Sequence, residues 1–165
     1  MKNNFEIFRK KMLKENLPEI VIQTFNFYYN QLMDGKSGYL PEDYLIPIDN
    51  LVTMDDLDDE MAYIGKDYLN KSVVIKLNGG LGTSMGLSDA KSLLKIKGDY
   101  TFLDIIAKQA ELSKVPLLLM NSFYTQNKSL ELLSKYKNLK YKFPLDFLQH
   151  KIPKINAETL LPVEF

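Results

Sequence analysis

The sequence contains no cysteine, a single histidine, His150, and a single arginine, Arg9. The lack of cysteine excludes disulfide frameworks, thiolate zinc sites, iron–sulfur clusters and cysteine nucleophiles. One histidine cannot supply the two imidazoles that many zinc sites need. Because every other basic residue is a lysine, bidentate recognition of phosphate or guanine by arginine is almost unavailable.

Net charge and long apolar runs are also lacking. Basic and acidic residues balance at 21 each, which argues against a dedicated nucleic-acid binder. The most apolar run, residues 115–120, is far shorter than the roughly 20 residues of a membrane-spanning helix. The amino terminus lacks the apolar stretch of a signal peptide. We therefore expect a cytoplasmic protein with no membrane partner.

The amino-terminal part has helical periodicity. Phe5, Phe8 and Met12 predict one helix, and Pro18 suits the first turn of a second helix that stops at 34–35. The predicted apolar face of the second helix is Val21, Phe25, Tyr28 and Leu32. An irregular connection with one glycine and two prolines follows at 36–48. We assign residues 1–70 to a helical amino-terminal segment.

From residue 71 the pattern alternates between strand and helix. Residues 72–77, 115–120 and 139–143 predict strands, and residues 101–113 and 125–136 predict helices. Thr101 and Asp104 form a capping-box pair at the first of these helices. Its predicted apolar face is Phe102, Ile105, Ile106, Gln109 and Leu112. This order is typical of an α/β fold with a partial parallel sheet over residues 71–165.

The predicted sheet is small, and the sequence closes on an apolar stretch at 160–165. Domain ends are usually polar and frayed. We therefore predict that the chain is truncated before its sheet is complete.

The glycine-rich segment 76–86, KLNGGLGTSMG, directly follows the first predicted strand, where α/β folds bind ligands. Gly79, Gly80 and Gly82 leave the backbone amides bare for an anion or a planar base. Thr83 and Ser84 add hydroxyl donors for phosphate oxygens. The spacing fits neither the dinucleotide fingerprint nor a P-loop, which needs Gly-Lys-Ser/Thr at its end. A glycine turn with no ligand is the alternative.

Lys91 lies a few residues beyond this loop. A lysine there has the reach to place a point charge on a bound phosphate. The alternative is a solvated surface lysine, no different from Lys95 or Lys97.

Five blocks together resemble one family. They are 76–86, 90–93 (AKSL), 101–104 (TFLD), 120–123 (MNSF) and the closing stretch 149–163. In order and spacing they resemble the eukaryotic-type UDP-sugar pyrophosphorylase family, in its UTP–glucose-1-phosphate uridylyltransferase branch. The related UDP-N-acetylhexosamine pyrophosphorylases carry alanine and arginine where Asn78 and Ser84 stand. Ala90 departs from the proline of many members.

The resemblance implies a role for each matching residue. Lys91 would stabilise the α-phosphate as the catalytic residue, and Gln149 would bind the uracil edge. The other substrate-binding residues would be Leu77, Gly79 and Gly80 as a wall at the uridine, Asn78 in the same loop, Gly82, Thr83 and Ser84 at the triphosphate, and Met120, Asn121 and Ser122 along the nucleotide side of the cleft. For the fold, the resemblance implies a Rossmann-like sheet of the nucleotide-diphospho-sugar transferase type.

The implied reaction is attack of glucose 1-phosphate on the α-phosphorus of UTP, which gives UDP-glucose and pyrophosphate. The resemblance also implies a Mg²⁺ cofactor, whose ligands in the family lie in blocks that this chain lacks. We therefore expect the chain to be inactive alone. A non-catalytic nucleotide-binding or interaction module that uses the same loop is the alternative.

Other features favour structural roles. The acidic run at 55–60 lacks the glycine and glutamate of an EF-hand loop and predicts a solvated helix start. His150 has no partner at metal-ligand spacing, which favours a rim residue. The aromatic residues at 25–29 favour packing. The lysines and tyrosines at 135–142 superficially resemble a nucleic-acid platform, which the zero net charge disfavours.

Overall fold

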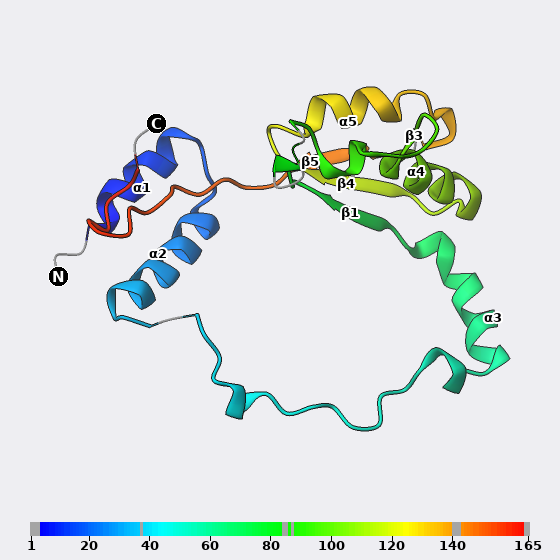
Figure 1. Cartoon of the computed structure of the whole chain (residues 1–165), viewed down its shortest axis with the longest axis horizontal. Helices are drawn as coiled ribbons and strands as arrows, with labels where there is room; N and C mark the ends of the chain where they lie inside the picture. The colour runs from blue at the N-terminus through cyan, green and yellow to red at the C-terminus, as the bar shows by residue number, and fades with distance from the viewer. Residues whose placement is uncertain (1–3, 37, 84–85, 87, 140–142, 164–165) are drawn as a thin grey trace. The chain divides into compact units, whose positions relative to one another are not determined.

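The computed structural model describes residues 4–36, 38–83, 86, 88–139 and 143–163. The chain forms two compact units, one of Met1–Asn50 with His150–Phe165 and one of Leu51–Gln149 (Figure 1). The closing segment therefore belongs with the amino-terminal helices, which the expected division at residue 70 did not anticipate.

The first unit is built on two helices, α1 (Phe5–Lys14) and α2 (Glu19–Met33). Both were predicted, and Gly35, with a φ of 72°, follows the C-cap Asp34 as expected. Their common core consists of Phe8, Met12, Ile22, Phe25 and Tyr29.

The predicted face of α2 was partly wrong. Tyr28 is 63% exposed and Leu32 is 42% exposed, whereas Ile22 and Tyr29 are 1% exposed. Because apolar residues occur around most of α2, periodicity alone does not choose between neighbouring faces. Contact with α1 decides it, since the ring of Phe8 lies 5.0 Å from that of Tyr29 and 5.1 Å from that of Phe25.

The closing segment folds back on these helices. The hydroxyl of Tyr29 donates to the carbonyl of Leu160 at 3.0 Å, and Lys11 Nζ donates to the carbonyl of Val163 at 2.9 Å. Lys151 forms an ion pair with Glu15. The irregular connection predicted at 36–48 contains one short 3₁₀ turn, η1 (Glu42–Tyr44).

The acidic run surrounds the start of a helix, as predicted. It spans η2 (Met54–Asp56) and the first residues of α3 (Asp59–Tyr68), and η3 (Leu69–Lys71) follows. Asp58 caps α3 by accepting a hydrogen bond from the backbone N–H of Met61 at 2.9 Å.

The second unit contains the predicted parallel sheet. Its three strands, β1 (Val74–Asn78), β4 (Leu117–Asn121) and β5 (Asp146–Leu148), lie in the order β1-β4-β5, and both pairings are parallel. A hairpin of β2 (Lys95–Lys97) and β3 (Tyr100–Thr101) follows the 3₁₀ turn η5 (Lys91–Leu93). The α/β fold with a small parallel sheet is thereby confirmed.

The third predicted strand was wrong in position. Residues 140–142 lie outside the described part of the chain, Leu139 ends the 3₁₀ turn η6 (Lys137–Leu139), and the strand is Asp146–Leu148. An apolar and aromatic run predicted the strand, but the strand that pairs with β4 begins with an aspartate. A polar start is favourable there because Asp146 has polar partners inside the unit.

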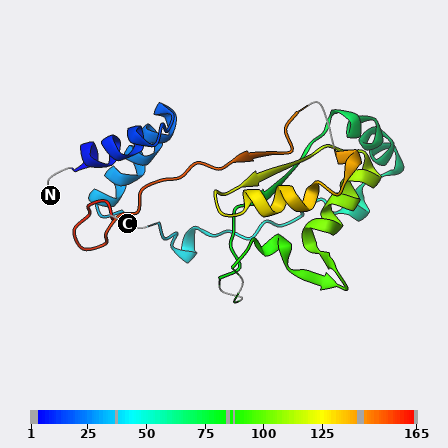
Figure 2. The same cartoon turned by 90° about the horizontal axis from the view of Figure 1, so that it is seen from above.

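Two helices, α4 (Phe102–Ser113) and α5 (Gln126–Leu133), pack against one face of the sheet (Figure 2). The core between them comprises Leu103, Ala107, Ala110, Leu117, Leu119, Leu132, Leu133 and Leu139. The predicted face of α4 was mostly wrong, since Phe102, Ile105 and Leu112 are exposed, although Ile106 packs against the core. The buried face carries Leu103, Ala107 and Ala110, and the two small alanine side chains suit the close packing of α4 with α5.

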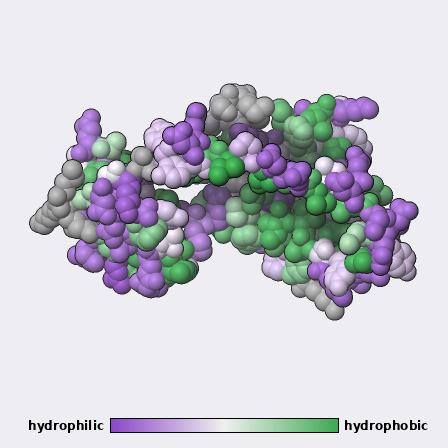
Figure 3. Space-filling model, turned by 90° about the horizontal axis from the view of Figure 1, so that it is seen from below, coloured by the Kyte–Doolittle hydropathy of each residue, from purple (hydrophilic) through white to green (hydrophobic). Residues whose placement is uncertain are grey.

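The opposite face of the sheet is apolar and exposed. Ile75 is 51% exposed, Leu77 is 65% exposed and Phe147 is 42% exposed. Figure 3 shows hydrophobic side chains gathered on one face of this unit. Parallel sheets are normally covered on both faces.

Among the described residues, no helix combines the length and hydropathy needed to cross a bilayer.

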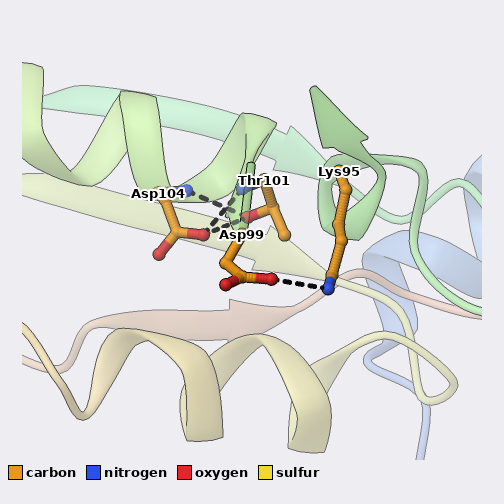
Figure 4. A network of polar contacts seen from close by, with 4 residues as sticks. All are labelled: Lys95, Asp99, Thr101 and Asp104. Atoms are coloured by element: carbon orange, nitrogen blue, oxygen red, sulfur yellow. Dashed lines mark hydrogen bonds and ion pairs between the residues drawn. The ribbon is translucent and has the colours of Figure 1, made fainter. Parts of the chain in front are cut away.

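The capping box at the start of α4 is confirmed (Figure 4). The backbone N–H and hydroxyl of Thr101 both donate to Asp104 Oδ2, at 2.8 and 2.7 Å, and the Asp104 N–H donates to Thr101 Oγ1 at 3.1 Å. The hydroxyl of Tyr136 donates to the other oxygen of Asp104 at 2.6 Å. Burial raises the pKa of Asp104, but the hydrogen bonds from Tyr136 and Thr101, with the charge of Lys135, outweigh it and lower the pKa. In the adjoining hairpin, Lys95 pairs with Asp99 at 3.0 Å.

Candidate functional site

The carboxyl ends of the three strands meet at one edge of the sheet. Asn78, the last residue of β1, pairs with Asn121 at the end of β4, and Asn121 pairs with Leu148 at the end of β5. The backbone N–H of Gln149 extends this ladder by donating to the carbonyl of Asn121 at 2.8 Å. Residues that the sequence analysis took from three separate blocks therefore lie together at this edge, which is where open α/β sheets bind ligands.

The glycine-rich loop leaves β1 at Asn78 and returns as a narrow ribbon. Gly82 N–H donates to the carbonyl of Asp89 at 2.9 Å, and Lys91 N–H donates to the carbonyl of Gly80 at 3.2 Å. Leu81 and Ala90 form a bridge between them. Thr83 is exposed near the far end of the ribbon, and Ser84 lies outside the described residues. Because residues 80–82 and 89–91 bond to each other, these two arms of the loop are held side by side.

Gln149 lies directly over the first glycine of the loop. A β-carbon built on Gly79 would overlap Gln149 Oε1 and would lie 2.9 Å from Gln149 Cδ. Gly80, in contrast, has open space around it. Two residues predicted to contact the base are therefore in direct contact, and a larger residue at 79 would require the end of the Gln149 side chain to move.

A buried polar network lies under the loop. Asn78 Nδ2 donates to Asn121 Oδ1 at 2.7 Å and to Ser129 Oγ at 2.9 Å, while Ser92 Oγ donates to Asn78 Oδ1 at 2.5 Å. Asn78 is 4% exposed and Asn121 is fully buried. The side chains of these two predicted substrate-binding residues are therefore occupied in linking β1, β4, η5 and α5 beneath the loop.

Sequence reasoning missed the residues that complete this network. Asp146 Oδ2 accepts hydrogen bonds from Asn121 Nδ2 at 3.0 Å and from Gln126 Nε2 at 2.8 Å. Ser92 belongs to η5, Gln126 and Ser129 to α5 and Asp146 to β5, so the four residues share no motif. The available signal was the asparagine that ends each of two apolar strands, because a buried amide needs polar partners.

The remaining predicted residues have these positions. Lys91 is exposed at the start of η5, Leu77 is exposed and Met120 is half-buried. Ser122 is buried, and its backbone N–H donates to Thr125 Oγ1 at 2.9 Å. His150 is exposed and begins the closing segment of the first unit. An ion pair between Lys128 of α5 and Asp89 ties the returning arm of the loop to the helix.

Among the described residues, carboxylate and imidazole groups do not cluster into a metal-binding site. Within the described residues, no three His, Asp or Glu side chains lie close enough together to hold an ion. The described residues therefore do not fit a protein-held Mg²⁺ site, and the edge offers backbone amides, hydroxyls and a lysine instead.

Comparison with known proteins identifies similar sequences. The family model described as UTP–glucose-1-phosphate uridylyltransferase matches residues 22–165. The chain is 40% identical over 128 residues to the UTP–glucose-1-phosphate uridylyltransferase of Hordeum vulgare, covering 74% of this chain and 26% of that protein. It is also 40% identical over 123 residues to the enzyme of that name from Encephalitozoon cuniculi, covering 71% of this chain and 24% of that protein.

Solved structures agree with these sequences. A mutant of the UDP-glucose pyrophosphorylase of Leishmania major, solved in complex with UDP-glucose, matches with a TM-score of 0.86 and 32% identity, covering all of this chain and 36% of that one. A UDP-glucose phosphorylase of Trypanosoma brucei matches with a TM-score of 0.79 and 33% identity, covering 98% of this chain and 34% of that one. The chain thus spans about a quarter of the length of the relatives above and about a third of the solved chains.

Proposed function

This chain belongs to the UTP–glucose-1-phosphate uridylyltransferase family, and from this membership we propose that it carries the uridine-nucleotide-binding part of such an enzyme. The proposed reaction of the whole enzyme joins UTP and glucose 1-phosphate to give UDP-glucose and pyrophosphate. The observation that carries the proposal is the contact between Gly79 and Gln149 at the carboxyl edge of the sheet. It brings a bare backbone and an amide side chain to one place, as recognition of a uracil requires.

The residues at this edge suit phosphoryl transfer, which depends on positioning and charge neutralisation. We assign the wall for the base to Leu77, Gly79 and Gly80, and the amide of Gln149 to the uracil edge. Gly82, Thr83 and Ser84 face the phosphates in this proposal. Lys91 neutralises charge that develops on the α-phosphate. Asn78 and Asn121 do not contact the nucleotide through their side chains in this proposal, because both side chains are buried. They act by positioning the ends of β1 and β4, where the loop begins.

Mg²⁺ remains a proposed cofactor. The described residues do not form a cage for it, so its protein ligands would have to come from elsewhere. Mg²⁺ is commonly held by substrate phosphates with few protein ligands. The proposed cytoplasmic location likewise remains a proposal.

Titration of UTP into the 165-residue chain tests the nucleotide site. We expect Gln149→Leu to weaken UTP binding because an apolar side chain leaves the polar edge of uracil unpaired. Gln23→Leu is the matched control, since Gln23 lies on the exposed surface of α2. Equal UTP affinity of the parent chain and Gln149→Leu would reject the uracil role.

Pyrophosphate release tests the catalytic part of the proposal. We expect no turnover from this chain alone, since it spans about a quarter of its relatives. In an active protein that contains this segment, Lys91→Ala should lower kcat by roughly 10²–10³, the usual loss of one preorganised donor. Lys97→Ala, another exposed lysine nearby, is the control. An unchanged kcat for Lys91→Ala would remove Lys91 from the reaction.

The second candidate is a non-catalytic module that binds a nucleotide through the same loop. The contact between Gly79 and Gln149 suits binding of a nucleotide whether or not a reaction follows. Tight UTP binding by a protein whose mature form ends at Phe165 and shows no turnover would support this alternative.

A further inference from the structure

We propose that Asp146 is a positioning residue that fixes the glycine-rich loop through a one-directional chain of hydrogen bonds. The chain runs from Asp146 through Asn121 and Asn78 to Ser92. The proposal rests on the proposed function in one respect, namely that the loop so positioned is the one that binds UTP.

The direction of the chain begins at the carboxylate. Asp146 Oδ2 faces the amide nitrogens of Asn121 at 3.0 Å and of Gln126 at 2.8 Å. An ionised carboxylate accepts hydrogen bonds and donates none. Both neighbouring carboxamides must therefore turn their NH₂ groups toward Asp146. For Asn121 this leaves the carbonyl oxygen pointing the other way, toward β1.

The orientation of the Asn121 carboxamide fixes the orientation of the Asn78 carboxamide through the hydrogen bond between them. Asn121 Oδ1 faces Asn78 Nδ2 at 2.7 Å, so Asn78 must donate there. The same nitrogen reaches Ser129 Oγ at 2.9 Å. The remaining acceptor of Asn78, Oδ1, then faces Ser92, whose hydroxyl donates at 2.5 Å. Each amide nitrogen in this chain of bonds donates and each amide oxygen accepts. Among the described residues, every buried side-chain nitrogen and oxygen has a partner.

The last two members of this hydrogen-bond chain, Asn78 and Ser92, stand at the two ends of the loop. Asn78 immediately precedes Gly79, and Ser92 immediately follows Lys91. The bond between Ser92 and Asn78 therefore closes the loop at its base, beside the backbone bond from Lys91 to Gly80 at 3.2 Å. Without an acceptor at 146, Asn121 is free to rotate its carboxamide by half a turn. Its NH₂ would then face the NH₂ of Asn78. The hydrogen bond from Asn78 to Asn121, which orients the Asn78 carboxamide oxygen toward Ser92, would be lost.

The test combines NMR of the ¹⁵N-labelled chain without ligand with UTP titration. We expect Asp146→Leu to shift or broaden the carboxamide signal of Asn78 and the amide signals of Gly79 and Gly80. It should also weaken UTP binding by at least about tenfold, as expected when a buried network loses a partner. Asp146→Asn, which keeps an acceptor oxygen, should restore both readouts to within about threefold of the parent affinity.

A second variant distinguishes the proposed orientation of Asn121 by Asp146 from the other role of Asp146, which is to hold α5 through Gln126. Gln126→Leu removes the other donor to Asp146 and leaves the chain from Asn121 to Ser92 intact. We expect it to leave the Asn78 carboxamide signal in place. An unmoved Asn78 signal in Asp146→Leu, or an equal effect of Gln126→Leu, would overturn the proposal. If Asp146→Leu does not fold, Asp146→Ser is judged by the same signals.

The two proposals fail in distinguishable ways. A parent chain that does not bind UTP contradicts the nucleotide site, while the Asn78 signal of the ligand-free variants still decides whether Asp146 orients the loop. A parent chain that binds UTP, with an affinity that Asp146→Leu leaves unchanged, retains the nucleotide site and contradicts the role of Asp146.

Discussion

The side chain of Gln149 rests on the backbone of Gly79, and a β-carbon at position 79 would overlap its Oε1. The two residues are far apart in the sequence and belong to different strand ends. They meet because Gln149 continues β5 past the end of β4, while Gly79 continues β1 on the other side of β4. This contact joins the glycine-rich loop to the third strand.

Gly79→Ala should destabilise the second unit by about 0.5–1.5 kcal/mol, the cost of an off-rotamer side chain, because the added methyl group pushes the end of Gln149 aside. Gly80→Ala is the matched comparison, since no atom lies within 4 Å of a β-carbon there. We expect Gly80→Ala to be neutral or slightly stabilising, because alanine restricts the unfolded chain. Hydrogen exchange of the β4 amides measures both effects. Equal protection in the two variants would show that Gln149 gives way freely.

Two Thr-x-x-Asp capping boxes allow a second comparison. Thr101→Ala should cost about 1 kcal/mol, because it removes the cap of α4 and leaves Asp104 short of a buried donor. Thr53 forms the same pair with Asp56 at an exposed 3₁₀ turn, where water replaces the lost bond. We therefore expect Thr53→Ala to have little effect on the free energy of unfolding. Similar losses for both variants would contradict a role for burial.

The bond between Tyr136 and Asp104 should make stability depend on pH. The pKa of Asp104 is lowered in the folded protein, so its contribution is present above the unfolded value of about 3.9 and is lost as the pH falls through the folded value. Tyr136→Phe should cost about 1.5–3 kcal/mol at neutral pH, the range for a bond to a charged group. The difference should shrink in acid.

Urea unfolding of Tyr136→Phe between pH 2 and 7 measures this dependence. Tyr124→Phe, at a position that is 78% exposed, serves as the control. A cost that stays constant across this pH range would show that the bond does not distinguish the charged form of Asp104.

The two faces of the sheet should respond differently to truncation. Leu119→Ala should cost about 2–5 kcal/mol, because Leu119 is fully buried under α4 and α5. Ile75→Ala should cost much less, because Ile75 is 51% exposed on the other face. Thermal unfolding of the two variants measures the difference. A large cost for Ile75→Ala in this chain would show that another surface covers that face in solution.

Local chemistry made several elements predictable. The cap of α4 depends on Thr101 and Asp104, which are three residues apart, and the stop of α2 depends on Gly35 at its end. The glycine-rich loop was recognisable for a similar reason, since its bare backbone is a property of consecutive residues. These features require no information about distant parts of the chain.

Features that depend on a distant partner were predicted poorly. The face that α4 buries is set by its packing with α5 over the core of the sheet, where Leu103, Ala107 and Ala110 are buried while Phe102 and Leu112 remain exposed. The third strand begins at Asp146 because amides of Asn121 and Gln126 are available to its carboxylate. Neither fact is visible in the periodicity of the segment itself.

The sequence by itself determined α1, α2, α4 and α5, the first two strands of the sheet, the capping box of α4 and the loop that follows β1, because each depends on neighbouring residues. The tertiary structure alone decided which faces are buried, that Gln149 covers Gly79, and that Asp146 joins Asn121, Asn78 and Ser92 in one network. Those relations depend on how parallel strands align side by side, which brings together side chains that are distant along the chain.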